Sequence, residues 1–101
     1  MQTLQTLVMN IKREFFAAIL TVPPRKTVEF REWKPYWENR LAKVGPAPFN
    51  LRLLNGMLPP VPEATVRVEK VTFDKKKQQI QLHLAEVLEV KNWDRKAERP
   101  A

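Results

Sequence analysis

The spacing of apolar residues along this chain changes from strand-like to helical and back, which predicts a mixed fold. Leu4–Ile11 is apolar and β-compatible and predicts a first strand, with Lys12 at its end. Arg13–Leu20 predicts a short helix because its bulky residues recur at helical spacing. Thr21–Pro24 ends that helix, since proline cannot continue it. The apolar face of the helix consists of Phe15, Phe16, Ile19 and Leu20.

The second predicted strand, Lys26–Trp33, carries different side chains on its two faces. Successive strand residues point to opposite sides, so Val28 and Phe30 share one face and are predicted to enter the core. A carboxylate, a guanidinium and an indole share the other face, where they are suited to stacking and hydrogen-bonding a planar ligand. That face consists of Thr27, Glu29, Arg31 and Trp33.

The middle of the chain predicts one more helix and one more strand. Lys34–Leu41 is predicted as a short helix with Pro35 in its first turn. Gly45–Pro48 is predicted as a loop, and the alternation in Phe49–Leu54 predicts the third strand. Asn55-Gly56 is a turn signal, and the prolines after it keep the next segment extended and out of a ladder.

The remaining pattern predicts a hairpin of two strands. The fourth strand begins near Val66, and a shift in its apolar phase predicts a bulge near Lys70. Asp74–Lys77 predicts a charged hairpin loop. The fifth strand begins near Ile80, and it continues or bulges as far as Val90. Its inner face holds Ile80, Leu82 and Leu84, and its polar face holds Gln79, Gln81 and His83.

These elements predict an α+β fold: a small curled mixed β-sheet or pseudo-barrel of about five strands, with one or two short helices. A chain of 101 residues makes one domain. We assign residues 1–93 to that domain, and 94–101 to a charged C-terminal tail that frays.

Composition excludes several kinds of chemistry. The chain has no cysteine and a single histidine, which excludes disulfides, thiolate metal sites, a cysteine nucleophile and a histidine-based metal cluster. We therefore predict no metal and no cofactor. No apolar run approaches the roughly 20 residues that span a bilayer, and no signal peptide is recognisable. These features predict a cytoplasmic protein without a membrane partner, with Met9 as an alternative start to Met1.

Charge adds a candidate partner. The formal net charge is +7, from 18 basic and 11 acidic residues, and a basic domain attracts polyanions such as nucleic acid. Positions 25–43 interleave six basic residues with four of the nine aromatic residues. This interleaving is typical of proteins that bind unpaired bases.

The N-terminal third resembles the ASCH domain of the PUA-like superfamily. That family opens with a strand ending in lysine, a short amphipathic helix, a turn and a Lys-Thr-x-Glu-x-Arg motif. Here the elements are Leu7–Lys12, Arg13–Leu20 and the motif Lys26-Thr27-Val28-Glu29-Phe30-Arg31. Thr21–Pro24 replaces the turn in which the family usually has a glycine. The resemblance implies a pseudo-barrel with a cleft and a role connected with RNA or nucleotides.

The binding hypothesis assigns a role to each candidate residue. Cations would contact phosphates, aromatic rings would stack on an unpaired base, and Glu29 and Arg31 would hydrogen-bond base edges. The cations are Lys12, Lys26 and Arg40, and the candidate stacking residues are Trp33, Tyr36 and Trp37. Thr27 completes the set as a neighbour on the strand.

Three alternatives remain open. A branch of the resembled family hydrolyses a nucleoside amide with a lysine and a threonine three residues later, but the residue three after Lys26 is Glu29. A ribonuclease would use Glu29 as a base, with Tyr36 or His83 as candidate acids. A protein-interaction module would use the same aromatic and arginine residues as a hot spot.

Overall fold

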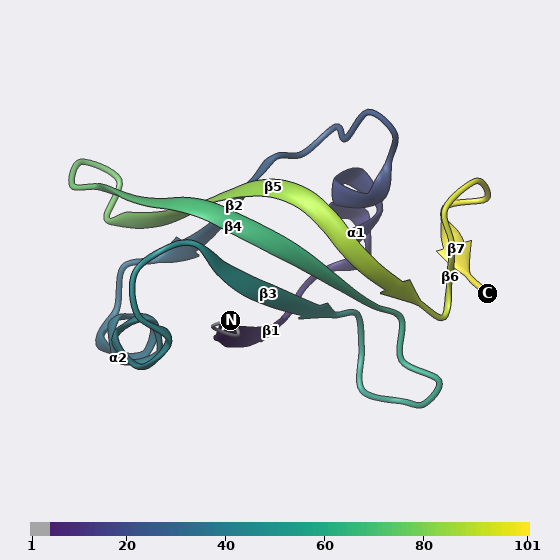
Figure 1. Cartoon of the computed structure of the whole chain (residues 1–101), viewed down its shortest axis with the longest axis horizontal. Helices are drawn as coiled ribbons and strands as arrows, with labels where there is room; N and C mark the ends of the chain where they lie inside the picture. The colour runs from purple at the N-terminus through teal and green to yellow at the C-terminus, as the bar shows by residue number, and fades with distance from the viewer. Residues whose placement is uncertain (1–4) are drawn as a thin grey trace, which may run out of the picture.

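A five-stranded sheet and two helices form the body of the protein, and the computed structural model describes residues 5–101 (Figure 1). The α+β class with a small curled mixed sheet is therefore confirmed. Leu4, the predicted start of the first strand, lies outside the described residues. The elements in chain order are β1 (Thr6–Asn10), α1 (Arg13–Leu20), β2 (Val28–Glu32), α2 (Pro35–Val44), β3 (Phe49–Leu54), β4 (Glu63–Asp74), β5 (Gln79–Lys91), β6 (Trp93–Asp94) and β7 (Arg99–Pro100).

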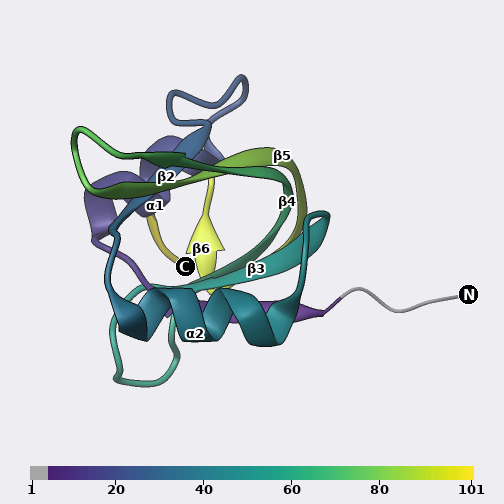
Figure 2. The ribbon, with the colours of Figure 1, turned by 90° about the vertical axis from the view of Figure 1, so that its left-hand side faces the viewer.

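The order of strands in the sheet is β1-β3-β4-β5-β2, so β1 and β2 are its two edges. β1 runs parallel to β3, and the other neighbours are antiparallel. Figure 2 shows the sheet curling toward itself, with α2 lying along β1. Because β1 and β3 are parallel, their C-terminal ends, Asn10 and Leu54, lie side by side.

Irregular pairing between the two longest strands bends the sheet. The register of β4 against β5 shifts at three places, between Thr65 and Val66, between Val66 and Val68, and between Val68 and Lys70. The last shift confirms the bulge predicted near Lys70. Bulges bend a strand and increase its twist, which gives the sheet its curl.

The core lies on the inner face of this curl. Alternate residues of the three central strands are almost fully buried, as the apolar alternation predicts. Each buried aliphatic side chain stabilises the fold by roughly 1.5–3 kcal/mol relative to its exposed state. The central set is Leu51, Leu53, Val66, Val68, Ile80 and Leu82.

The orientation of β2 is the reverse of the prediction. Glu29 is only 3% exposed, whereas Phe30 is 41% exposed and lies outside the core. The register explains this, because Glu29 pairs with Leu82 and Phe30 pairs with Gln81. Paired residues of antiparallel strands point to the same face of the sheet, so the face of β2 that carries Glu29 and Arg31 lies on the same side as the buried residues of β5. The alternation separates the two sets correctly, but it does not indicate which set faces inward.

The two helices differ from expectation in smaller ways. In α1, Phe16, Ile19 and Leu20 are buried, but Phe15 is 40% exposed and does not belong to the core face. α2 continues past the predicted end to Val44. Gly45 then terminates it with a positive φ of 84°, a conformation that glycine adopts readily, and donates its N–H to the Leu41 carbonyl.

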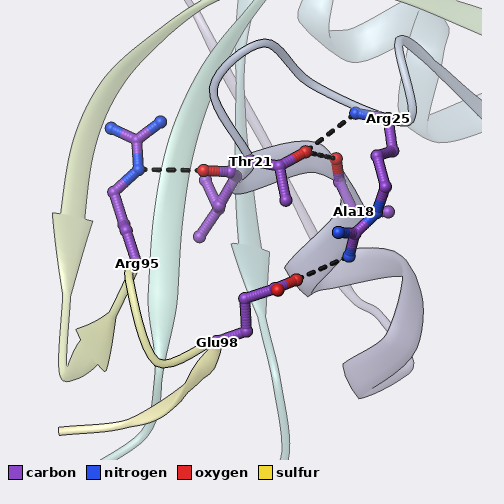
Figure 3. Close-up of polar contacts among 6 residues, drawn as sticks. Ala18, Thr21, Arg25, Arg95 and Glu98 are labelled. Carbon is purple, nitrogen blue, oxygen red and sulfur yellow. Dashed lines mark hydrogen bonds and ion pairs between the residues drawn. The ribbon is translucent and has the colours of Figure 1, made fainter.

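The C-terminal segment forms a short ribbon where the sequence predicts a frayed tail. β6 and β7 pair antiparallel, and Trp93 is 6% exposed, with its ring edge-on to Phe16 at 5.0 Å between centroids. Figure 3 shows two further ties: Arg95 Nε donates to the Leu20 carbonyl, and Arg25 forms an ion pair with Glu98. A buried tryptophan and these polar ties hold the charged segment against α1.

Within residues 5–101, no helix is long and apolar enough to cross a bilayer. No group of three or more histidine, cysteine or acidic side chains in that range is arranged to hold a metal ion.

Candidate functional site

An open pocket of about 730 Å³ lies where the C-terminal ends of β1 and β3 meet α1 and β2. Four of the predicted site residues line it, and two of the aromatic side chains that lie outside the core stand at its wall. The parallel pairing of β1 and β3 brings Lys12 and Asn55 to the same end of the sheet. We call this the basic pocket, defined by Lys12, Lys26, Glu29, Arg31, Phe15 and Phe30.

Glu29 is the buried polar group of this pocket. Its Oε1 accepts the N–H of Phe30 at 3.0 Å and lies 4.0 Å from Arg31 Nη1. Its Oε2 is buried, and no group of residues 5–101 forms a hydrogen bond with it. A buried carboxylate that is only partly hydrogen-bonded is costly to the fold. Glu29 therefore lines the pocket as a carboxylate with unused hydrogen-bonding capacity.

Lys26 lies between two exposed rings. Its Nζ is 5.0 Å from the ring centroid of Phe15 and 4.7 Å from that of Phe30, both cation–π distances. The turn before β2 fixes this lysine, because the backbone N–H groups of Arg25 and Lys26 both donate to the Ala18 carbonyl. Thr21 strengthens the turn by accepting the Arg25 N–H and donating to Ala18 (Figure 3). The end of α1 thus sets the position of the cation.

Arg31 and Arg40 share a structural role. Arg31 Nη2 donates to the Asn10 carbonyl at 2.7 Å, and Arg40 Nη2 donates to the Val8 carbonyl at 3.3 Å. Both guanidinium groups lie near the ring of Trp37, at 5.5 and 5.8 Å from its centroid. The arginines therefore satisfy carbonyls along edge strand β1, which would otherwise present unpaired groups. Arg31 lines the basic pocket and also fastens β2 to β1.

The other predicted site residues lie elsewhere. Thr27 is exposed and outside the basic pocket, and its carbonyl accepts the N–H of Leu84. Trp33 packs on Phe73 at the opposite end of the sheet, with 4.9 Å between ring centroids. Tyr36 is 60% exposed on α2, where it contacts Trp37 edge-on. The structure thus brings together Lys12, Lys26, Glu29 and Arg31, but not Thr27, Trp33, Tyr36 or Arg40.

Phe15 and Phe30 are the site residues that sequence reasoning misses. Both were expected in the core, because an exposed and a buried phenylalanine look alike in an apolar pattern. Asn10, Asn55 and Gly56 complete the wall, and Asn10 Nδ2 donates to the Gly56 carbonyl at 3.2 Å. The Asn55-Gly56 turn signal marks the end of β3, but only the parallel β1–β3 pairing shows that it borders the pocket.

The surroundings of the pocket bear on hydrolysis. Acid–base cleavage would need a second acid or base in reach of Glu29 or Lys26. His83 pairs with Val28 on the outer face of the sheet, where its Nε2 lies 2.7 Å from Thr72 Oγ1. Within residues 5–101, no histidine or carboxylate of β4 or β5 forms an ion pair or hydrogen bond with Lys26 or Glu29.

No protein-family model, curated protein or solved structure matches this chain.

Proposed function

We propose that the basic pocket binds an unpaired nucleotide of single-stranded RNA. The observation that carries the proposal is Glu29, a buried carboxylate with an oxygen that no group of residues 5–101 hydrogen-bonds, in a pocket whose lining also includes two exposed rings and the cations Lys12 and Lys26. Base edges carry N–H donors that a carboxylate accepts, and base faces stack on aromatic rings. The volume of about 730 Å³ lies within the range of small-molecule sites.

Each group has a part in this binding. Lys12 and Lys26 neutralise phosphate charge, which makes the affinity fall with salt. Phe15 and Phe30 supply the rings on which a base stacks, in place of Trp33, Tyr36 and Trp37, which the sequence alone suggested. Arg31 acts mainly by positioning β2 against β1. The proposal agrees with the likeness of Lys26–Arg31 to the ASCH motif, and it does not require a reaction.

The test is fluorescence anisotropy of a labelled single-stranded RNA, at about 50 and about 200 mM salt, a range over which phosphate contacts lose much of their affinity. Phe30→Ala is expected to weaken binding about 5-fold to 150-fold, since stacking contributes roughly 1–3 kcal/mol per base. Lys26→Ala is expected to weaken binding and to flatten the salt dependence, by about 0.7 in the logarithmic slope if the lysine neutralises one phosphate.

Lys96→Ala is the matched control, because it removes the same charge from the exposed C-terminal ribbon. Equal binding by wild type, Lys26→Ala and Phe30→Ala would show that the basic pocket is not the site. Failure of the wild type to bind at low salt would remove the proposed function altogether. RNA recovered on a gel should be intact, and shortening that depends on Lys26 would favour the hydrolase alternative.

A further inference from the structure

Part of β4 has a neighbour on one side only. Within residues 5–101, β3 pairs with β4 only as far as Phe49 opposite Val68, so the stretch from Lys70 to Asp74 is paired with β5 alone. Figure 1 shows this end of the β4–β5 hairpin projecting beyond β3. Beyond the bulge, Lys70–Asp74 pairs with His83–Gln79 without a further shift. The edge is therefore five regular residues long and leaves alternate N–H and C=O groups available for another strand.

An apolar groove of about 710 Å³ lies beside this edge. Val71 and Phe73 of β4 line it together with Trp33, and Leu41 and Ala42 of α2 also belong to its lining. Phe73 is 47% exposed although its ring lies 4.9 Å from that of Trp33. The inner face of the sheet thus stays apolar up to an edge that residues 5–101 leave uncovered.

The sequence of this edge is complementary to itself. If two copies run antiparallel about a two-fold axis through Thr72, Lys70 lies opposite Asp74 of the second copy, and Val71 lies opposite Phe73 of the second copy. Opposite charges, β-branched with aromatic residues, and threonine with threonine are all favourable cross-strand pairs. Backbone N–H and C=O groups of every second residue point away from β5. With the two-fold axis through Thr72, the two edges can form antiparallel hydrogen bonds whether these groups belong to the odd-numbered or to the even-numbered residues.

We infer that Lys70–Asp74 of β4 is a self-association edge, through which two copies of this chain join their sheets antiparallel about Thr72. Antiparallel partners share a face, so Val71 and Phe73 of each copy meet beside the apolar grooves. Lys70 and Asp74 meet on the opposite face. Asp74 is available for this, because its one side-chain contact within residues 5–101 is the N–H of Lys77, which donates to Oδ1. The edge is independent of the basic pocket and of the function proposed for it.

The contact is small, so association is expected to be weak and to depend on concentration. Stable interfaces bury about 1,200–2,000 Å² in total, more than five edge residues and one exposed ring supply. The dimer should therefore form between about 10 µM and 1 mM, which corresponds to roughly 4–7 kcal/mol. Sedimentation velocity over that range is expected to show a weight-average mass that rises with concentration from the monomer mass toward twice that mass.

Charge exchange tests the register. The two-fold axis produces two Lys70–Asp74 pairs in each dimer. Lys70→Glu and Asp74→Lys each turn both pairs into like-charge pairs, and each is expected to weaken dimerisation at least 10-fold. The double variant Lys70→Glu/Asp74→Lys restores both pairs with exchanged signs, and it should regain most of the affinity. Lys96→Glu changes the net charge as Lys70→Glu does, but it lies between β6 and β7, which Figure 1 shows on the opposite side of the molecule from the tip of the β4–β5 hairpin, and it should not affect the dimer.

A second variant guards against loss of folding in the charge variants. The chain has no cysteine, so Thr72→Cys introduces one thiol that faces its own copy at the two-fold axis. Mild oxidation is expected to cross-link this variant faster than Lys96→Cys. The inference is overturned if the wild type stays monomeric throughout, if the double variant does not recover while Thr72→Cys cross-links no faster than the control, or if Lys70→Glu dimerises like wild type.

Discussion

At the scale of single residues, Glu29 is buried although its burial costs the fold stability. Its partner on β5 is Leu82, and an apolar residue beside that leucine would pack at lower cost. The unpartnered Oε2 instead leaves a charged group buried with incomplete hydrogen bonding. Residues that weaken a fold in this way are found at functional sites, which is why the proposed function depends on this carboxylate.

Glu29→Gln separates stability from binding. The amide keeps the shape and still accepts the Phe30 N–H, but it removes the buried charge. We expect the free energy of unfolding without ligand to rise by about 1 kcal/mol, because a buried neutral amide costs less than a buried charge. RNA affinity should fall in the same variant. Urea denaturation and anisotropy measure the two effects, and a less stable variant with unchanged affinity would contradict the role of Glu29.

At the scale of elements, the apolar alternation predicts β3, β4 and β5, including the bulge near Lys70. These strands have one apolar face, so their orientation follows from their sequence. β2 has an apolar and a polar face of similar size, and only its pairing with β5 decides that Glu29 turns inward. The C-terminal ribbon could not be predicted from periodicity, because Trp93 is a single apolar residue in a charged segment.

The C-terminal ribbon is expected to be part of the stable fold. Trp93→Ala removes a side chain that is 6% exposed and packs on Phe16. We expect the free energy of unfolding to fall by about 3 kcal/mol, the lower end of the range for large aromatic residues. Chemical denaturation of this variant, with Trp93→Phe as the conservative control, measures the loss. A change below about 0.5 kcal/mol, as at ordinary surface positions, would show that the ribbon adds little to the stability of the fold, as expected if residues 94–101 fray.

The β3–β4 ladder contains a pair that responds to pH. Arg52 donates two hydrogen bonds to Glu63, at 2.7 and 3.2 Å, and these hold the pKa of Glu63 below its ordinary value. The unfolded chain therefore binds a proton at this position before the folded chain does as pH falls. The stabilisation is present above pH of about 4.3 and is lost as pH falls through the folded pKa.

Glu63→Gln measures that contribution. The difference in unfolding free energy between wild type and variant should be small at pH 7, because exposed ion pairs contribute little, and should shrink further on acidification. Urea titrations at pH 7 and at about pH 3, below the ordinary glutamate pKa, supply the comparison. A difference that grows as the pH falls would contradict the sign of the linkage.

At the scale of the whole molecule, the curled sheet has two separate surfaces. The basic pocket lies where β1 and β3 end, and the free edge of β4 lies at the other end of the sheet, beyond the first residue of β3. A dimer through that edge would carry two basic pockets, and one RNA strand that reaches both would bind with higher avidity. The net charge of +7 would attract RNA to many places on the surface, so charge alone does not locate the site.

Mapping the surface that RNA contacts is therefore the most direct test of binding at the basic pocket. Amide NMR spectra of the labelled protein, titrated with a short single-stranded RNA, report each residue whose surroundings change. We predict the largest shifts at Lys12, at Lys26–Arg31 and at Asn55–Gly56, with small changes at the cationic hairpin tip, Lys75–Lys77. Shifts concentrated at that tip, or spread evenly over the lysines, would show that charge, and not the pocket around Glu29, governs binding.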